Sequence, residues 1–408
     1  MYLLKTIIVA TFLLIFFSIR KSKAQESTSR IVSSLNEFIN PIKTISPDSN
    51  FSDLEVLRES LKDKTIISLG EATHGTREFF LYKDGLIRFL VSELGYKAIA
   101  FEADFSAVQN LDDYINSKTE SINTGQGGFP LIQETRSMLS WLRTYNQSKA
   151  PENRVHLYGL EARGFSNICG QILNSLISLP SENRELLRRI QQTKYFDLST
   201  KDINGVRAIL PYLYNETDKD KNGLNRHCVT MLDQVADNYL NRKFGKRDEF
   251  MAANATWILE NTNSDNLIIW AHNGHISKSA LFRGASLGTY LYQKYNTGYF
   301  AIATDFNQGE ASVFVKKNGR ITLGSKFYPE VTSANAYEYY FNQCKFQNFM
   351  INISALNGHE VLVPFFSKNL SMKMVGGTDG LIRIKLSILE NFDLIVFLNK
   401  TTSVDNKK

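Results

Sequence analysis

The chain has 408 residues, of which 43% are hydrophobic and 22% charged, a balance typical of a globular protein. Its formal net charge is +6, but four positive charges lie in the first 24 residues, which hold no acidic residue, and without them the net charge is +2. A nearly neutral remainder gives no electrostatic reason to expect nucleic acid or an anionic membrane surface as a partner.

The first 24 residues have the pattern of an export signal. Lys5 precedes an apolar run at 7–19, and residues 22–24 place small side chains where a signal peptidase favours them. We therefore expect a signal peptide over 1–24 and a periplasmic or secreted mature chain. The alternative is an uncleaved membrane anchor, because three basic residues follow the run. The run is shorter than the roughly 20 residues of a membrane span.

Strand-like and helix-like segments then alternate along the chain. Residues 25–50 are polar and weakly periodic, which predicts a helical turn and a loop. Short apolar runs predict strands buried on both faces, as in parallel sheets. These runs lie at 65–69, 98–101, 155–158, 267–270, 300–303, 360–363 and 394–398, and helical patterns lie at 77–94, 135–145, 181–192 and 228–242.

This alternation predicts an α/β fold with a mainly parallel central sheet flanked by helices. Residues 165–260 are polar and helix-periodic with few strand-like runs. We interpret them as a helical insertion or subdomain within one domain spanning 25–408. Cys169, Cys228 and Cys344 are too widely spaced for a disulfide framework or a zinc motif, so buried thiols are expected, with one disulfide as the alternative.

Ionisable residues gather where the predicted strands end. Ligands of α/β sheets bind beyond the carboxyl ends of the strands. We expect a catalytic group there, made of Glu71 and His74 after the first strand, Glu102 after the second, and His272 and His275 after the fourth. Other candidates near these ends are Arg77, Glu78, Asp104, Glu161 and Asp305, the first four as substrate-binding residues, whereas His156, His227 and His359 are interpreted as structural.

These residue types suit water activation. Imidazole titrates near neutral pH, so it can deprotonate water and return the proton to a leaving group. A neighbouring carboxylate fixes its tautomer, and a second histidine can stabilise an oxyanion. Gly-x-Ser-x-Gly occurs once, at 284–288, but it does not directly follow a predicted strand, as a nucleophile elbow would, and the sequence has no Walker loop or Gly-x-Gly-x-x-Gly. Activated water is therefore favoured over a covalent serine, and no cofactor is expected.

Several segments, taken in order, resemble the erythromycin esterase family. They are 70–80 (GEATHGTREFF), 94–96 (LGY), 101–103 (FEA), 247–257 with its Arg-Asp, Met-Ala, Asn and Trp, 271–275 (AHNGH), 298–299 (GY) and 306–309 (FNQG). The resemblance implies a metal-independent carboxylic ester hydrolase that opens a macrolide lactone with water and confers macrolide resistance.

The resemblance also implies residue roles. His74 would be the general base, Glu71 and Glu102 would orient it, and His272 and His275 would complete the site. The family's arginine nine residues after the base histidine corresponds to Lys83, which would bind substrate. Lysine keeps the positive charge but loses the planar fork of arginine. The expected substrate is therefore either a macrolide lactone or a related ester.

Two other functions fit the same residues. The first is a metal- or haem-binding exported protein, because histidines and carboxylates are also metal ligands and His272 and His275 have chelate-compatible spacing. The second is a non-catalytic envelope protein that uses the pocket for recognition.

Overall fold

The computed structural model describes residues 25–122, 129–176, 178–218, 223–241, 246–262, 264–282, 284–317, 319–380 and 382–404. The predicted signal peptide, residues 1–24, lies outside the described residues, so export stays a prediction. Among the described residues, no helix combines the length and the apolar character that crossing a membrane requires.

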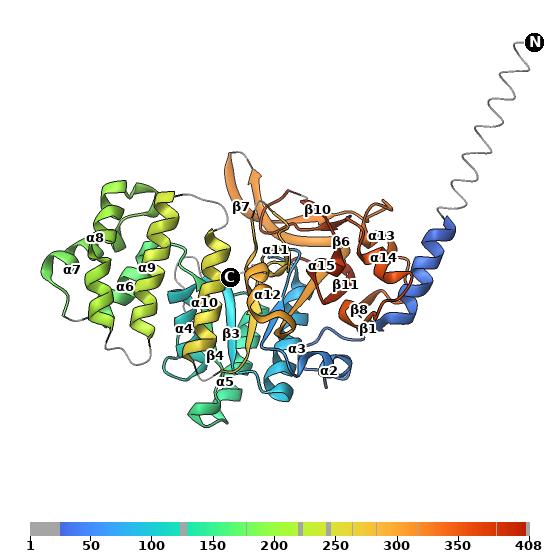
Figure 1. Ribbon diagram of the computed structural model, residues 1–408, viewed down its shortest axis with the longest axis horizontal. Helices are drawn as coiled ribbons and strands as arrows, with labels where there is room; N and C mark the ends of the chain where they lie inside the picture. Colours follow the sequence, from blue (N-terminus) through green and yellow to red (C-terminus); the bar gives the residue numbers. More distant parts are fainter. Residues whose placement is uncertain are drawn as a thin grey trace, which may run out of the picture.

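A central sheet of nine strands, counted over the described residues, runs in the order β1-β8-β11-β6-β2-β5-β3-β4, with β7 paired to β6 (Figure 1). The pairs from β11 to β4 are parallel, whereas β1–β8, β8–β11 and β6–β7 are antiparallel. The predicted mainly parallel sheet is confirmed. The strands are β1 (Ile39–Pro41), β2 (Ile66–Leu69), β3 (Ala98–Asp104), β4 (His156–Glu161), β5 (Leu267–Trp270), β6 (Tyr299–Lys317), β7 (Arg320–Tyr328), β8 (Asn348–Asn352) and β11 (Leu394–Thr401), with β9 (Leu370–Lys373) and β10 (Arg383–Leu386) forming a separate pair.

Helices cover both faces of this sheet. Alternate residues of a strand point to opposite faces, and both sets are buried here: Ile67 and Ile268 pack in one apolar cluster, Ile66 and Leu267 in the other. The first cluster includes α3 (Arg77–Leu94), α4 (Phe105–Ile115) and α5 (Gln133–Gln147). The second includes α10 (Lys246–Asn261), α12 (Leu287–Tyr295), α13 (Tyr337–Phe341), α14 (Leu362–Phe366) and α15 (Ile388–Asn391).

Four helices between β4 and β5 enclose a hydrophobic cluster of their own (green in Figure 1). They are α6 (Phe165–Ser175), α7 (Ser181–Gln192), α8 (Thr200–Thr217) and α9 (Leu224–Asn241). Phe105 of α4 joins this cluster and so connects the helices to the sheet. Helix α10 contacts β4. The three cysteines are buried as thiols, and burial raises the pKa of Cys169 to about 12.

Three details differ from the sequence predictions. Residues 25–38 are helical and lead into β1, where a turn and a loop were expected. Strand β6 continues for 19 residues, so Asp305 lies within it and not at its end. The predicted strand at 360–363 is wrong. Helix α14 begins at Leu362 instead, where the His359 Nδ1 accepts the backbone N–H groups of Val361 and Leu362. A short apolar run has no period that separates a buried helix from a strand.

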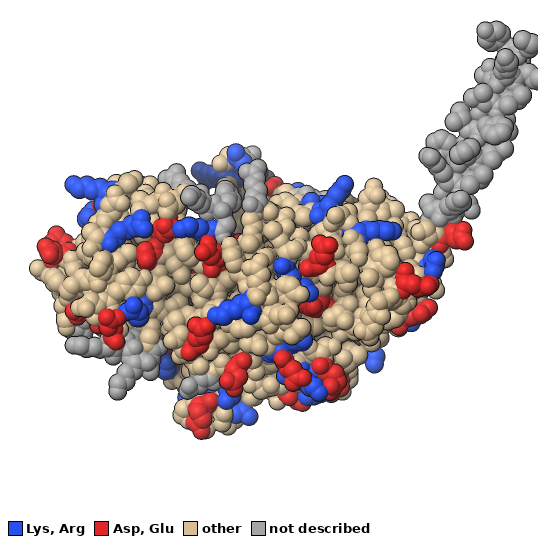
Figure 2. Space-filling view, viewed as in Figure 1, with Lys and Arg blue, Asp and Glu red and all other residues tan. Residues whose placement is uncertain are grey.

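On the face shown in Figure 2, acidic and basic side chains are intermixed. That view contains no large area of one charge sign, which agrees with the nearly neutral charge of the chain after residue 24.

Candidate active site

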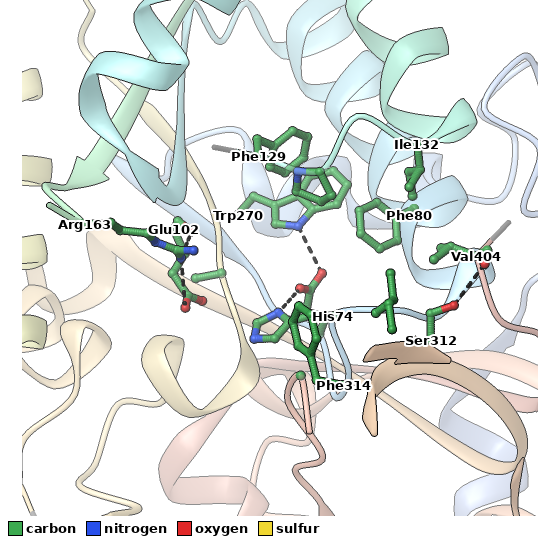
Figure 3. A pocket seen from close by; sticks show the side chains of 15 residues that line it. His74, Phe80, Glu102, Phe129, Ile132, Arg163, Trp270, Ser312, Phe314 and Val404 are labelled. Carbon is green, nitrogen blue, oxygen red and sulfur yellow. Dashed lines mark hydrogen bonds and ion pairs between the residues drawn. The ribbon is translucent and has the colours of Figure 1, made fainter. Parts of the chain in front are cut away.

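A cavity of about 320 Å³ opens at the carboxyl ends of β2, β3 and β5 (Figure 3). Its charged lining residues are Glu71, His74, Glu102 and Arg163. Apolar side chains surround His74: in Figure 3 Phe80 and Ile132 lie on the side away from Arg163, Phe129 and Trp270 lie above the imidazole, and Phe314 lies below it. They include Phe80, Phe129, Ile132, Trp270, Phe314 and Leu323.

The Glu71 carboxylate binds His74 through one oxygen, and its other oxygen accepts two further hydrogen bonds. The His74 Nδ1 lies 2.7 Å from Glu71 Oε1. The Lys83 Nζ donates to Glu71 Oε2 at 2.5 Å, and the Trp270 Nε1 donates to the same oxygen at 3.0 Å. The Lys83 ammonium also lies 4.0 Å from the centre of the Trp270 ring, a cation–π contact. Both oxygens of Glu71 are therefore fixed in direction.

The position of His74 follows from its loop. Glu71 and His74 lie three residues apart in the short loop between β2 and α3, and the His74 N–H donates to Gly376 O at 3.2 Å. The imidazole is 40% exposed and lines the cavity. Its Nε2 has no hydrogen-bond partner among the described residues, so this nitrogen is available to a molecule in the cavity.

The charges in this group depend on one another. Burial would raise the pKa of Glu71, but the Lys83 ammonium and the hydrogen bond with His74 outweigh it and lower that pKa. Burial opposes protonation of His74, yet the bond to Glu71 and the charge of Glu102 raise its pKa above the usual value. Burial lowers the pKa of Lys83 to about 8. At neutral pH, Glu71 is therefore an anion beside a cationic lysine.

A second ionic group surrounds Glu102. The pairing of β3 with β4 shifts register between Phe101 and Asp104, next to this residue. The Glu102 Oε2 accepts the His272 backbone N–H at 2.9 Å, and Oε1 accepts Arg247 Nη2 at 2.9 Å. Burial would raise the pKa of Glu102, but His275, His74 and Arg247 hold it well below the usual value. Glu102 is thus a fixed anion on the cavity wall.

His275 lies behind Glu102, between two carboxylates. Its Nδ1 is 2.6 Å from Asp248 Oδ1, and its Nε2 is 3.4 Å from Glu102 Oε1 and 3.1 Å from Arg247 Nη1. Burial lowers the pKa of His275, but Glu102 and Asp248 outweigh it and raise that pKa to about 10. His275 therefore contributes positive charge to the group around Glu102.

His272 differs from both other histidines. Its Nδ1 accepts the Gly274 N–H at 3.1 Å, so Nε2 carries the proton and faces Ala72 O at 3.3 Å. Burial, together with the charge of His74, lowers the pKa of His272 to about 3. Its ring centre lies 5.2 Å from that of His74. His272 is a neutral neighbour of His74 with both nitrogens hydrogen-bonded.

The structure brings together Glu71, His74, Glu102, His272 and His275, as expected. Lys83 lies beneath Glu71, 1% exposed, and does not line the cavity. Three other candidates bond elsewhere: Arg77 Nε donates to Glu134 Oε1, Glu78 accepts from Thr402, and Asp104 caps α4 by accepting the Ala107 N–H. Glu161 pairs with Arg163 and Arg247 beside the cavity. Substrate contact by these five residues stays a prediction.

Sequence reasoning assigned no role to Arg163, Arg247, Asp248 or Trp270. Arg247 and Asp248 lie in the first turn of α10, and Arg247 joins Glu161 of β4 and Glu102 of β3. Arg247 and Asp248 could have been recognised because they are the first two residues of the 247–257 segment that resembles the family. The signal for Trp270 was its position at the end of β5, directly before the 271–275 segment.

Comparisons with other structures give the same fold. A crystal structure of a Bacillus cereus protein superposes with a TM-score of 0.81 at 22% identity, covering 93% of this chain and 99% of that one. A mutant of the erythromycin esterase EreC, solved in its open conformation, superposes with a TM-score of 0.69 at 17% identity, covering 90% of this chain and 98% of that one.

Sequence comparisons identify the family. Erythromycin esterase type II of Escherichia coli is 25% identical over 59% of this chain and 67% of its own length. The putative hydrolase YbfO of Bacillus subtilis is 23% identical over 61% of this chain and 67% of its own length. The sequence model of the family described as erythromycin esterase matches residues 91–401. The chain therefore belongs to the erythromycin esterase family, and this membership indicates a hydrolase.

Proposed function

We propose that the protein is a carboxylic ester hydrolase in which His74 activates a water molecule. The observation that supports this most is the orientation of the imidazole. Glu71 holds Nδ1 at 2.7 Å, so Nδ1 carries the proton and the unprotonated Nε2 is available in the cavity. A neutral imidazole fixed in this tautomer is suited to act as a general base.

In the proposed reaction, the water oxygen attacks the ester carbonyl carbon while His74 Nε2 takes a proton from the water. The carbonyl electrons move to oxygen and form a tetrahedral oxyanion. When the ester C–O bond breaks, the imidazolium returns the proton to the departing alkoxide. The products are a carboxylic acid and an alcohol, so a lactone gains one water and opens.

Positive charge lies close to this reaction. Arg163 lines the cavity and donates from Nη2 to the Glu102 backbone oxygen at 2.7 Å. A guanidinium at this place can stabilise a developing oxyanion. Glu102 and His275 act through the electrostatic field, because Glu102 raises the pKa of His74 and His275 keeps Glu102 ionised.

We propose a macrolide lactone or a related ester as the substrate. Two curated relatives bear the name erythromycin esterase, at 25% and 22% identity. At this identity the macrolide is the first compound to test, with macrolide resistance as its cellular consequence. We also propose that the protein is exported, with residues 1–24 removed, which N-terminal sequencing of the mature protein would reveal.

The metal- or haem-binding alternative receives less support from the histidines. Both ring nitrogens of His272 accept or donate to backbone groups, and both of His275 face side-chain partners. A metal would have to displace these partners. Among the described residues, no three His, Cys, Asp or Glu side chains are grouped so that they could hold a metal ion. We therefore propose that hydrolysis needs no metal.

The direct experiment is mass spectrometry of erythromycin incubated with the purified protein, followed by a panel of lactones and simple esters. A product heavier by one water that His74→Asn does not form would support the proposal. Hydrolysis of no compound in the panel would contradict it. Elemental analysis of the same sample, with activity measured after chelation, tests metal independence. Stoichiometric zinc, manganese or iron with chelator-sensitive activity would favour the metal-dependent alternative.

A further inference from the structure

The part of the cavity wall formed by β6 and β7 carries large apolar side chains that are exposed. As far as Gly309, β6 lies inside the sheet, and from there it pairs with β7 as a two-stranded ribbon that projects from the body (Figure 1). In this ribbon Phe314 lies opposite Leu323. Phe314 is 55% exposed and Leu323 is 47% exposed, and both line the cavity that contains His74.

The alternation of side chains explains why these residues face the cavity. On β6, Val313 points to the buried side, where it joins the apolar cluster of α3 and α5. Because successive residues of a strand point to opposite faces, Phe314 points the other way. Its cross-strand partner Leu323 lies on the same face of the ribbon. The sheet core therefore fixes which face of the ribbon turns toward the cavity.

The ribbon is also tied directly to the loop that carries His74. The Ser312 N–H donates to Gly75 O at 2.9 Å, and the Phe314 N–H donates to Gly377 O at 2.8 Å. A Cβ atom at Gly377 would lie 3.4 Å from His74 Cδ2 and 4.0 Å from Phe314 Cδ2. The His74 and Phe314 rings therefore both approach the Gly377 position and line the same cavity, so a group bound at His74 lies close to Phe314.

The opposite wall is apolar as well. Phe80, Phe129 and Ile132 line the cavity across from Phe314, whereas Arg163 lies at the other end near Glu102 (Figure 3). Exposed apolar side chains that border a concave site usually mark a surface that binds an apolar group. We propose that Phe314 and Leu323 bind a bulky hydrocarbon group of the substrate, so the enzyme prefers esters with such a group beside the scissile bond. This proposal rests on the proposed ester hydrolysis and narrows its substrate class.

Ile321 supplies a matched control within the ribbon. It lies two residues before Leu323 on the same face of β7, and it is 72% exposed, but it does not line the cavity. A substrate in the cavity would contact Leu323 and not Ile321. A ribbon that docked on a lipid surface or on another protein would use both.

The test measures kcat/KM for 4-nitrophenyl acetate, butyrate, hexanoate and octanoate, and for acetate esters of alcohols of increasing length. We expect kcat/KM to rise with length in one series. Leu323→Ser and Phe314→Ser should each reduce the ratio of the longest to the shortest ester at least about tenfold, the usual range for a contact in an apolar pocket. Ile321→Ser should keep the wild-type ratio. Two flat series, a ratio unchanged by Leu323→Ser, or an equal loss in Ile321→Ser would overturn the proposal.

A binding experiment separates this proposal from ester hydrolysis itself. N-phenyl amides of the same acids lack an ester, and calorimetric titration measures their Kd without turnover. We expect longer amides to bind more tightly, with Leu323→Ser weakening the longest about tenfold. If the protein hydrolyses no ester but shows this pattern, the hydrolase proposal fails and the apolar site stands. N-alkyl acetamides of increasing length probe the alcohol side in the same way. If hydrolysis occurs but the Kd depends on length in neither amide series, only the apolar site is wrong.

Discussion

Lys83 Nζ lies 2.5 Å from Glu71 Oε2, beneath the carboxylate whose other oxygen holds His74. We therefore expect Lys83 to act as a positioning residue, since it reaches the cavity only through Glu71. Its charge offsets the burial of that carboxylate and keeps Glu71 ionised. A buried ammonium, unlike a guanidinium, can lose its proton near neutral pH.

This relationship predicts a bell-shaped pH profile for kcat/KM. His74 must be neutral to accept a proton, so activity should fall as the pH drops through its raised pKa. Lys83 has a pKa of about 8, so activity should fall again above that pH as Glu71 loses its cation. In Lys83→Arg the alkaline limb should move up by at least about one pH unit, because arginine stays protonated. An alkaline limb left in place by Lys83→Arg would assign it to another group.

Removing the base should abolish most of the rate without unfolding the protein. For His74→Asn we expect kcat to fall by about 100- to 10,000-fold, the usual contribution of a general base, with an unchanged Tm because the side chain is 40% exposed. The matched control is His156→Asn. The His156 side chain is 41% exposed, and its Nδ1 lies 3.1 Å from Asp112 Oδ1. His156 is the first residue of β4, so it lies at the amino ends of the strands, whereas the cavity lies at their carboxyl ends. Equal losses in both variants would mean that the effect is not specific to the cavity.

The loop that carries His74 should not tolerate a side chain at Gly75. A Cβ atom there would collide with the backbone carbonyl of Ser312 on β6. We expect Gly75→Ala to lower the free energy of unfolding by about 1–3 kcal/mol or more. The control is Gly85→Ala in α3, where the added Cβ would lie 3.5 Å from Pro47 Cα, an ordinary contact. That change should stabilise the helix by roughly 0.5–1 kcal/mol in urea unfolding. Equal stability of the two variants would count against the tight loop packing.

A buried carboxyl away from the cavity should make stability depend on pH. Burial and the charge of Glu338 raise the pKa of Asp305 well above its usual value, and its Oδ2 has no hydrogen-bond partner among the described residues. The folded state therefore keeps a proton that the unfolded chain releases above about pH 3.9. The stability from this group is complete below that pH and is lost as the pH rises through the folded pKa.

Asp305→Asn should accordingly stabilise the protein more near neutral pH than at about pH 4, as measured by urea unfolding. Asp113→Asn, which removes a surface partner of Lys118, should change stability by less than about 1 kcal/mol at both values. A stabilisation by Asp305→Asn that is the same at both pH values would show that Asp305 is ionised in the folded protein.

Much of the fold could be predicted because parallel strands have a strong local signal. The runs at 65–69, 98–101 and 267–270 are apolar throughout, since both faces of β2, β3 and β5 are buried. The helix predicted at 77–94 has the bounds of α3, which ends before Gly95, and this glycine takes the left-handed conformation with φ 73° that is common after a helix. The 360–363 run misled because apolar residues pack equally well in a short buried helix.

The amino-acid sequence was enough to predict that one edge of the sheet carries Glu71, His74, Glu102, His272 and His275, because the carboxyl ends of parallel strands all lie there. Their hydrogen-bond and packing partners, in contrast, depend on the tertiary structure. Lys83 bonds to Glu71, Arg247 bridges Glu102 and Glu161, and Phe314 faces the cavity, through contacts between elements that are distant in the chain. Local patterns encode which face of a strand or helix is buried, whereas the atoms that meet across elements depend on how the whole core packs.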